Sequence, residues 1–255
     1  MSKSAEWNFG IHSVQALLSS RSKRLKEVIF AKDRRDKRLQ KLIDLAKDQH
    51  VKIRFLDRQS FDRQLRNAEL TEQSHQGVLA LCAPVEIGND EDLDVLLQQD
   101  FQQPPLFLVL DGVTDPHNIG ACLRTCDAAG VTALIVPRDK SASLTGTAAK
   151  VASGAAETIP FIQVTNLARS LRKLQEAGVW LVGTAGEAEQ DLFQAKLTGP
   201  MALVMGAEGK GMRRLTRETC DELIKIPMVG SVSSLNVSVA TGVCLYEIVR
   251  QRSHS

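Results

Sequence analysis

From Leu106 to the end of the chain, short apolar segments alternate with helical segments, and this alternation constrains the fold more than any other feature. The apolar segments include LFLVL (106–110), VTALIVP (131–137) and MALVMG (201–206). Because these runs carry almost no polar residues, they are typical of strands buried on both faces of a sheet. Strands that alternate with helices favour a largely parallel sheet with helices on both sides. Ligands of such sheets bind at the carboxyl ends of the strands, so functional residues are expected there.

Residues 1–83 are predicted to form a second, smaller α/β domain. The strand patterns EVIFA, VKIRFL and GVLALC alternate there with three helical stretches. Residues 84–104 are acidic and Gln-rich, and Pro104 and Pro105 close the stretch, which predicts a linker or covering segment. The expected organisation is therefore an N-terminal domain, a linker at 84–104 and a larger α/β domain over residues 105–255.

Positive charge is concentrated in the N-terminal part. Residues 1–84 hold 17 Lys and Arg against 10 Asp and Glu, whereas residues 85–255 hold 15 against 20. The chain as a whole has a net charge of only +2. A basic module joined to a slightly acidic one fits a protein that grips a polyanion with one of its parts. From charge alone, a solvated charged surface explains the same residues equally well.

Several function classes lack their signals in this sequence. It has no run of about 18 apolar residues that could span a bilayer and no hydrophobic segment of the signal-peptide kind at its start, so a cytoplasmic protein is expected. Its five cysteines include no C-x-x-C pair, which predicts reduced structural thiols and no metal site. Neither the dinucleotide-binding nor the P-loop fingerprint is present.

The loop DGVTDPHNIGACLR holds two candidate site residues. Asn118 is expected near the N-cap of a helix that runs to about Ala129, and capping alone could explain it. Arg124 lies among apolar residues of that helix and needs an anionic partner. That partner is either a ligand or a structural carboxylate such as Asp127 or Asp111.

Two later loops add further candidates. Glu208 is the only acid among the glycines of MGAEGKGM, which lets a ligand approach the backbone, although a tight turn with an exposed Glu would look the same. Ser233 or Ser234 is expected to cap the last helix, from about Leu235, with Asn236 inside its first turn. One cap leaves the other hydroxyls of this segment unexplained, so the surplus predicts a polar pocket wall.

Three segments carry a family resemblance. NIGACLR (118–124), VMGAEGKGM (204–212) and IPMVGSVSSLNVSVATGVCLYE (226–247) resemble, in this order and spacing, the three motifs of the SpoU/TrmH family of RNA ribose 2'-O-methyltransferases. The N-terminal stretches NFGIHSVQALL and HQGVLAL are similar to the substrate-binding domain of bacterial members. The resemblance implies a trefoil-knotted catalytic domain of SPOUT type that binds S-adenosylmethionine against knotted backbone. The implied cofactor-binding residues are Gly206, Ile226, Leu235, Thr184 and Met228.

The same resemblance implies a catalytic set, which comprises Asn118, Arg124, Glu208, Ser234 and Asn236. Glu208 would hold Asn118 and its loop in place, while Ser234 and Asn236 would shape the pocket floor. Because a guanidinium has a pKa above about 12, we expect Arg124 to bind the phosphate beside the target and steer the hydroxyl, with the proton leaving to water or another acceptor.

Partners follow from the resemblance as well. The chain is especially similar to members that methylate a guanosine in the peptidyl-transferase P loop of 23S rRNA, and the family implies a homodimer in which Arg124 reaches the neighbour's pocket. The RNA contacts expected in the basic domain are Arg21, Lys23, Arg24, Arg34, Arg35 and Arg38. The same chemistry on tRNA or another rRNA site is the nearest alternative. A non-enzymatic ribosome-assembly factor is another, but it predicts damaged motifs, and none is damaged.

Overall fold

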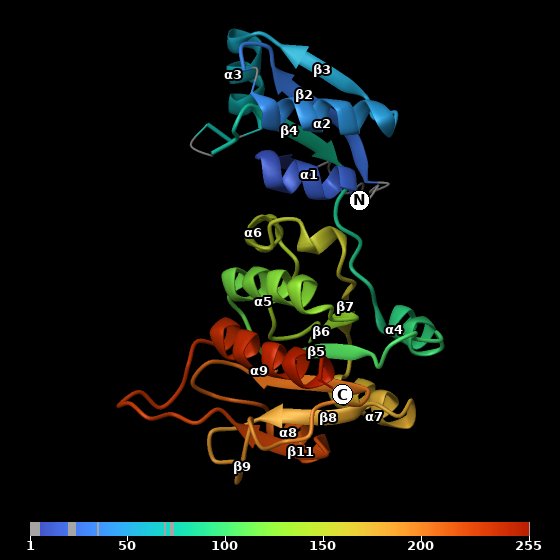
Figure 1. The fold of residues 1–255 in the computed structure, drawn as a ribbon, viewed down its shortest axis with the longest axis vertical. Coiled ribbons are helices and arrows are strands. Elements are labelled where there is room, and N and C mark those ends of the chain that lie inside the picture. Colours follow the sequence, from blue (N-terminus) through green and yellow to red (C-terminus); the bar gives the residue numbers. More distant parts are fainter. Residues whose placement is uncertain (1–5, 20–23, 35, 69, 72–73, 255) are drawn as a thin grey trace. The chain divides into compact units, whose positions relative to one another are not determined.

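The protein divides into two compact units, residues 1–85 and 86–255, which are described separately (Figure 1). The computed structural model describes residues 6–19, 24–34, 36–68, 70, 71 and 74–254. Within these residues, no helix is both long and apolar enough to cross a membrane.

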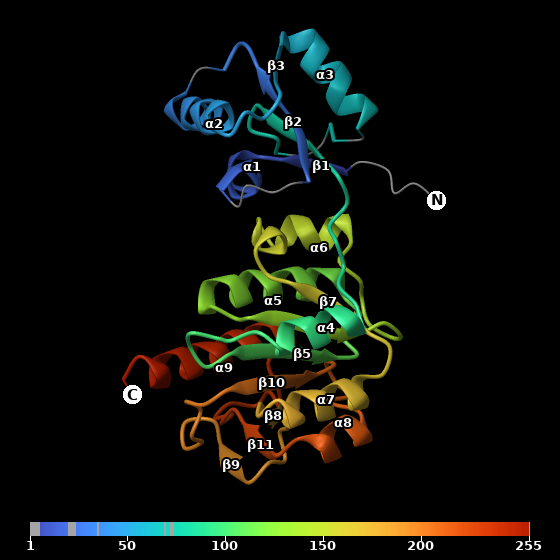
Figure 2. The same ribbon diagram turned by 90° about the vertical axis from the view of Figure 1, so that its right-hand side faces the viewer.

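A four-stranded mixed sheet forms the centre of the N-terminal unit. Its strands, in sheet order, are β1 (Glu6–Phe9), β4 (Val78–Cys82), β2 (Leu25–Ala31) and β3 (Ile53–Leu56). Its helices are α1 (Ile11–Ser19), α2 (Lys37–Asp48) and α3 (Arg58–Asn67). Successive residues of β2 point to opposite faces of the sheet, which places helices on both sides of it. Val28 and Phe30 pack against α1 and α2, whereas Ile29 packs against α3 on the other face (Figure 2). The sequence patterns missed β1, a short edge strand that pairs antiparallel with β4.

All seven strands of the C-terminal unit run parallel, which confirms the predicted sheet. In sheet order they are β7 (Phe161–Val164), β6 (Ala133–Pro137), β5 (Leu106–Asp111), β10 (Met201–Gly206), β8 (Trp180–Thr184), β11 (Glu222–Lys225) and β9 (Gln190–Asp191). The central strands β5 and β10 are buried along almost their whole length, as their continuous apolar sequences require. The carboxyl ends of the strands therefore lie along one edge of the sheet.

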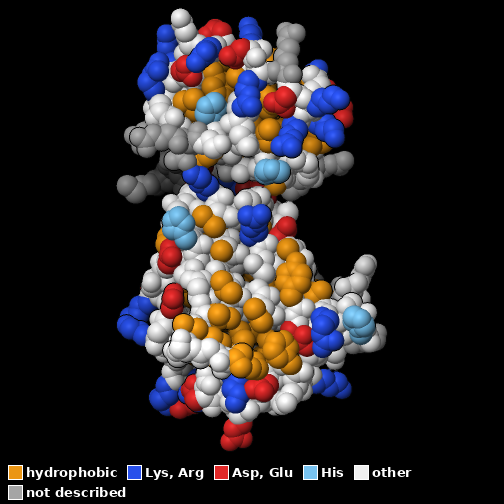
Figure 3. All heavy atoms as spheres, turned by 60° about the vertical axis from the view of Figure 1, so that its left-hand side comes forward, with side chains coloured by type: hydrophobic (Ala, Val, Ile, Leu, Met, Phe, Trp, Pro, Cys, Tyr) orange, Lys and Arg blue, Asp and Glu red, His pale blue; other side chains and the backbone are white. Residues whose placement is uncertain are grey.

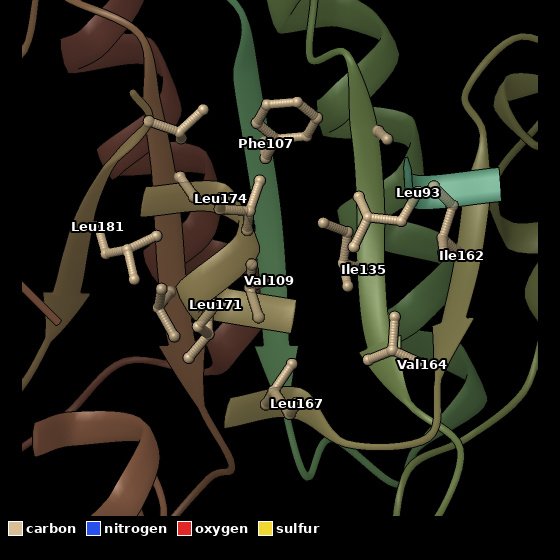
Figure 4. Close-up of a cluster of buried hydrophobic side chains, with 14 residues drawn as sticks. Leu93, Phe107, Val109, Ile135, Ile162, Val164, Leu167, Leu171, Leu174 and Leu181 are labelled. Carbon is tan, nitrogen blue, oxygen red and sulfur yellow. The ribbon is translucent and has the colours of Figure 1, made fainter. Parts of the chain in front are cut away.

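Helices cover both faces of this sheet. They are α4 (Asp90–Leu97), α5 (Pro116–Ala129), α6 (Gly146–Val151), α7 (Leu167–Glu176), α8 (Arg214–Thr219) and α9 (Val237–Arg252), together with a 3-10 turn at Ala155–Glu157. On one face, Leu167, Leu171 and Leu174 of α7 and Leu93 of α4 pack against strand residues such as Phe107 (Figure 4). On the other face, α5 and α9 pack against each other.

Residues 84–104, expected to link the domains, are largely built into the C-terminal unit. They contain α4, whose Asn89 and Asp92 form a capping box and whose Leu93 is fully buried in the core. Gly88 also pairs with β7 through two backbone hydrogen bonds. The acidic composition hid this packing because a single buried leucine per short helix gives little periodic signal.

The cysteines behave as structural residues. All five are free thiols, and four of them are buried. Burial raises the pKa of Cys122 to about 11 and that of Cys244 to about 12, so both thiols stay protonated at neutral pH.

The C-terminal helix holds a buried carboxylate that makes stability depend on acid. Hydrogen bonds from Arg250 hold the pKa of Glu247 at about 2, below its ordinary value of 4.5. Because the folded-state pKa lies below the unfolded one, this contribution is complete above about pH 4.5 and is lost as the pH falls towards 2. We expect the free energy of unfolding, measured with urea between pH 2 and 6, to fall less steeply with acid in Glu247→Gln than in the unmodified protein. Equal slopes would contradict this assignment.

Candidate active site

A cavity of about 860 Å³ opens at the carboxyl ends of β8, β10 and β11. Its walls come from residues 184–187, 205–212, 224–228 and 233–235, together with Asp191, Arg217, Val237 and Ala240. Its volume lies in the range of small-molecule sites. The position is the one expected for a ligand site of a parallel sheet.

The loop after β10 forms the closest wall of this cavity. Ala207 and Gly211 exchange two backbone hydrogen bonds of 3.1 and 2.8 Å, which folds the loop back over the end of its strand. Gly209 and Gly211 adopt positive φ angles of 75° and 65°. A Cβ on Gly206 would lie 2.2 Å from backbone atoms of Gly211 and Met212, so only glycine fits at this position.

The structure brings the five residues expected to bind the cofactor to this one cavity. They are Thr184, Gly206, Ile226, Met228 and Leu235. Two members of the expected catalytic set, Glu208 and Ser234, line it as well. Residues from the three segments that follow β8, β10 and β11 therefore meet, as the parallel strand order requires.

The other three expected catalytic residues lie outside the cavity lining. The Nδ2 of Asn236 donates a hydrogen bond of 3.1 Å to the Oδ1 of Asn118, which joins the starts of α9 and α5. Arg124 is exposed on α5, and none of its potential partners in the described chain forms an ion pair with it. The structural carboxylates considered for it are used elsewhere, since Asp127 accepts from Thr158 and Asp111 pairs with Arg213.

Both helix caps at the site differ from the predicted ones. Asp115 caps α5 by accepting a hydrogen bond from the backbone N of His117, so Asn118 lies inside the first turn. The preceding Asp-Pro explains this, because Pro116 suits the first helical position and its carboxylate neighbour suits the cap. At the last helix, Asn236 is the cap rather than Ser233 or Ser234, and it accepts from the backbone N of Ser238.

Among the described residues, no hydrogen bond joins Glu208 to Asn118, so the role expected for Glu208 stays a prediction. Its side chain is exposed in the cavity wall, and the Oδ1 of Asn118 accepts its hydrogen bond from the Nδ2 of Asn236. The charges around the cavity are balanced, because Glu187 pairs with Arg217 and Asp191 lies 3.7 Å from Lys225. The cavity therefore offers mixed polar and apolar walls without a strong net field.

Two family models match the chain over most of its length. The SpoU rRNA Methylase family matches residues 105–246, and the RNA 2'-O ribose methyltransferase substrate binding family matches residues 7–88. The chain belongs to the SpoU rRNA methylase family. The resemblance seen in the three motifs is thereby confirmed.

Curated relatives of this SpoU chain match it almost from end to end. The 23S rRNA (guanosine-2'-O-)-methyltransferase RlmB of Photobacterium profundum is 58% identical over 244 residues, 96% of this chain and 97% of the relative. The RlmB of Pasteurella multocida is 60% identical over 245 residues, with 96% and 97% covered. The solved SpoU methyltransferase AviRb from Streptomyces viridochromogenes, in complex with the cofactor AdoMet, has a TM-score of 0.77 at 22% identity and covers 98% of this chain and 92% of its own. At that identity, it shows a shared fold.

The expected RNA contacts in the basic unit separate into three groups. Arg21, Lys23 and Arg35 lie outside the described residues. The side chain of Arg24 is only 12% exposed, and its Nε donates to the carbonyls of Ala83 and Pro84, so its role is structural. Arg34 and Arg38 are exposed and line a hollow of about 400 Å³ together with Lys37, Ile11, Asp36 and Gln76.

Sequence reasoning missed a charged pair beside the cavity. Asp111 is fully buried at the end of β5, and Arg213 follows the loop after β10. The Oδ2 of Asp111 accepts a hydrogen bond of 2.8 Å from the backbone N of Arg213. An acid that ends an otherwise apolar strand was the available signal. Among the described residues, no cluster of three or more His, Cys, Asp or Glu side chains could hold a metal ion.

The crowding at Gly206 gives a direct test of the site geometry. In Gly206→Ala, the added methyl must displace the backbone of the loop, so we expect a loss of about 1–3 kcal/mol in the free energy of unfolding. Gly186→Ala is the matched control, because Gly186 lines the same cavity but a Cβ there meets nothing within 4 Å. We expect the control to change stability by less than about 0.5 kcal/mol. Urea titrations of the two variants would measure the difference, and equal stabilities would contradict the crowding.

Proposed function

We propose that this SpoU chain transfers a methyl group from S-adenosylmethionine to the ribose 2'-hydroxyl of a guanosine in 23S rRNA. The observation that carries the proposal is that the second and third motifs meet around one cavity, while the hydrogen bond from Asn236 to Asn118 joins the first motif to the third. Relatives that are 58–60% identical over 96% of the chain bear the name of this reaction, and they match both the catalytic and the substrate-binding parts. Because the proposed substrate is ribosomal RNA, we infer that the protein acts in the cytoplasm, where ribosomes are assembled.

The cavity suits a methyl donor that carries both a purine and an amino-acid end. Apolar side chains of Met205, Ile224 and Val237 line it beside the polar loops. The missing side chain at Gly206 lets the backbone of Gly211 and Met212 pack against it, so the loop after β10 folds closely over the strand end. Gly206, Gly209 and Gly211 make this part of the cavity wall largely main chain, which supports binding by main chain more than by a side-chain fingerprint. We infer that Gly206, Ile226 and Leu235 would hold the donor through their backbone. The donor supplies an activated methyl group on a sulfonium.

The RNA-facing residues orient the acceptor hydroxyl in this proposal. The Asn118–Asn236 hydrogen bond fixes the starts of α5 and α9 next to each other, so both amides can contact one nucleotide. Ser234 and Glu208 lie in the cavity wall, where they contact the ribose side of the site. Arg124, permanently charged, binds the neighbouring phosphate and steers the hydroxyl, and the proton leaves to water.

We infer that two copies of the chain form the working enzyme through α9. Val239 and Tyr246 lie two turns apart on this helix, and each is 53% exposed. Figure 3 shows hydrophobic side chains gathered on one surface of the C-terminal unit, as an interface between copies would need. In such a dimer, the exposed Arg124 of one protomer serves the cavity of its partner.

The decisive experiment is transfer of a labelled methyl group from S-adenosylmethionine to unmodified 23S rRNA and, separately, to bulk tRNA. We expect label to appear as 2'-O-methylguanosine at one position of the peptidyl-transferase P loop. Arg124→Ala should reduce the rate at least about 100-fold, because it removes the group that positions the acceptor. Arg172→Ala, which removes an exposed arginine of α7, is the matched control and should keep full activity.

Other outcomes would correct the proposal in defined ways. Label in tRNA alone would keep the chemistry and replace the substrate. Absence of label from both RNAs, with no binding of S-adenosylmethionine, would favour a non-enzymatic assembly factor. An Arg124→Lys variant that keeps most of the rate at every pH would contradict a role for the planar guanidinium.

The hollow beside α2 predicts how the N-terminal unit holds RNA. Arg34 lies between β2 and α2 and Arg38 in the first turn of α2; both line the hollow and are exposed. Removal of either should weaken binding of a 23S rRNA fragment and lower the slope of log affinity against log salt by about 0.7–0.9 per lost phosphate contact. Lys47→Ala, at the opposite end of α2, is the matched control. Salt titrations that give one slope for all four proteins would contradict this contact surface.

A further inference from the structure

An ion pair between a fully buried aspartate and a partly exposed arginine joins two loops at the carboxyl edge of the sheet. Asp111 ends β5 and is 0% exposed, and in the sheet it lies directly beside Gly206, which ends β10. Its Oδ2 accepts a hydrogen bond of 2.8 Å from the backbone N of Arg213. The Nε of Arg213 lies 3.4 Å from the Oδ1 of the same carboxylate. One side chain thus contacts both the backbone and the guanidinium of the residue that follows the cavity loop.

Such a pair is a poor source of stability. Taking a carboxylate out of water is costly, and the attraction of a partly exposed arginine offsets that cost only in part. Within the described part of the chain, the Oδ1 of Asp111 accepts no hydrogen bond, so the carboxylate is incompletely satisfied. An apolar pair of similar volume would often be as stable, which directs attention to the geometry that this pair fixes.

The pair connects the segments that carry the two halves of the site. Asp111 directly precedes residues 112–115, which lead into α5 with Asn118 and Arg124. Arg213 directly follows residues 206–212, which form the cavity wall that includes Glu208. A shift of one segment against the other would therefore move the cavity relative to the RNA-facing residues.

The same arginine reaches a third strand-end loop. Its Nη2 donates a hydrogen bond of 3.3 Å to the carbonyl of Asp139, in the loop after β6. That loop is in turn bonded to the first one, because Ser141 Oγ and Ala142 N both donate to the carbonyl of Val113 at 3.0 and 2.8 Å. The loops after β5, β6 and β10 thus form one connected unit around Arg213.

We infer that Asp111 and Arg213 are positioning residues for methyl transfer, which hold the cavity wall and the Asn118 segment in one fixed arrangement. This inference rests on the proposed function, because it concerns the same site. Neither residue needs to touch the substrate. Their effect is on the distance and angle between the donor and the acceptor hydroxyl, to which transfer rates are highly sensitive.

The first test compares Arg213→Ala with Arg214→Ala. The control removes the same charge from the next residue, whose side chain is 81% exposed and pairs with Glu218 on its own helix. Single-turnover methylation of 23S rRNA is measured at a temperature at which circular dichroism shows each protein fully folded. We expect Arg213→Ala to lower the transfer rate about 10- to 100-fold and Arg214→Ala to stay within about twofold. Equal rates for the two variants would overturn the inference.

A double-mutant cycle separates positioning from general destabilisation. If Arg213 acts by placing the Asn118 segment, Arg213→Ala should cost little in a chain that already carries Asn118→Ala. Independent losses that multiply in the double variant would overturn the inference. Asp111→Asn supplies a second, nearly isosteric variant that can still accept from the Arg213 backbone N, and it should keep more of the rate than Asp111→Ala.

Methyl transfer by the unmodified protein shows whether the proposed function or only the positioning role is wrong. If it transfers no methyl group to 23S rRNA, the proposed function fails and this inference fails with it. If it is active and the rate of Arg213→Ala equals that of Arg214→Ala, only the positioning role is wrong.

Discussion

The parallel direction of all seven strands is the constraint on which the rest of the C-terminal unit depends. It brings the ends of β5, β8, β10 and β11 to one edge of the sheet, although these strands are spread over more than a hundred residues of sequence. The loops after β8, β10 and β11, which have no local reason to meet, therefore surround one cavity. The loop after β10 also folds back on the end of its own strand at backbone distance, because one methyl group on Gly206 would have no room beside Gly211 and Met212. Chemistry at this edge depends on main-chain geometry as much as on side chains.

Much of the site could be predicted from the sequence because its residues sit in short loops next to strongly apolar strands. The residues expected around the cofactor, such as Gly206 and Leu235, were found on one cavity because strand order alone brings their loops together. The predicted helix caps were wrong because several adjacent residues could serve as the cap of each helix. Asp115 and Pro116 displaced Asn118 from the cap, and Asn236 displaced the serines, since only the backbone path decides among them. Partners distant in sequence, such as Arg213 for Asp111, have no local signal at all.

The order of the strands in the sheet cannot be read from sequence patterns. β10 lies between β5 and β8, and β11 lies between β8 and β9, so later strands enter between earlier ones. The trefoil knot implied by the family resemblance stays a prediction about this path. The assignment of Arg24 illustrates a similar limit in the basic unit, where counting charges could not distinguish a buried structural arginine from exposed ones such as Arg34.

The last helix, α9, is hydrogen-bonded to the rest of the C-terminal unit at both of its ends. Asn236, its cap, is bonded to Asn118 at the carboxyl edge of the sheet. Arg252, in its last turn, donates to the carbonyls of Pro104 and Gly199, which precede β5 and β10 at the opposite edge. A helix of 16 residues spans about 24 Å, so α9 runs from one edge of the sheet to the other. Side-chain hydrogen bonds fix it to the start of α5 at one end and to the segments that precede the central strands at the other. The Asn118–Asn236 pair at the carboxyl edge is thus connected, through a single helix, to carbonyls on the far side of the sheet.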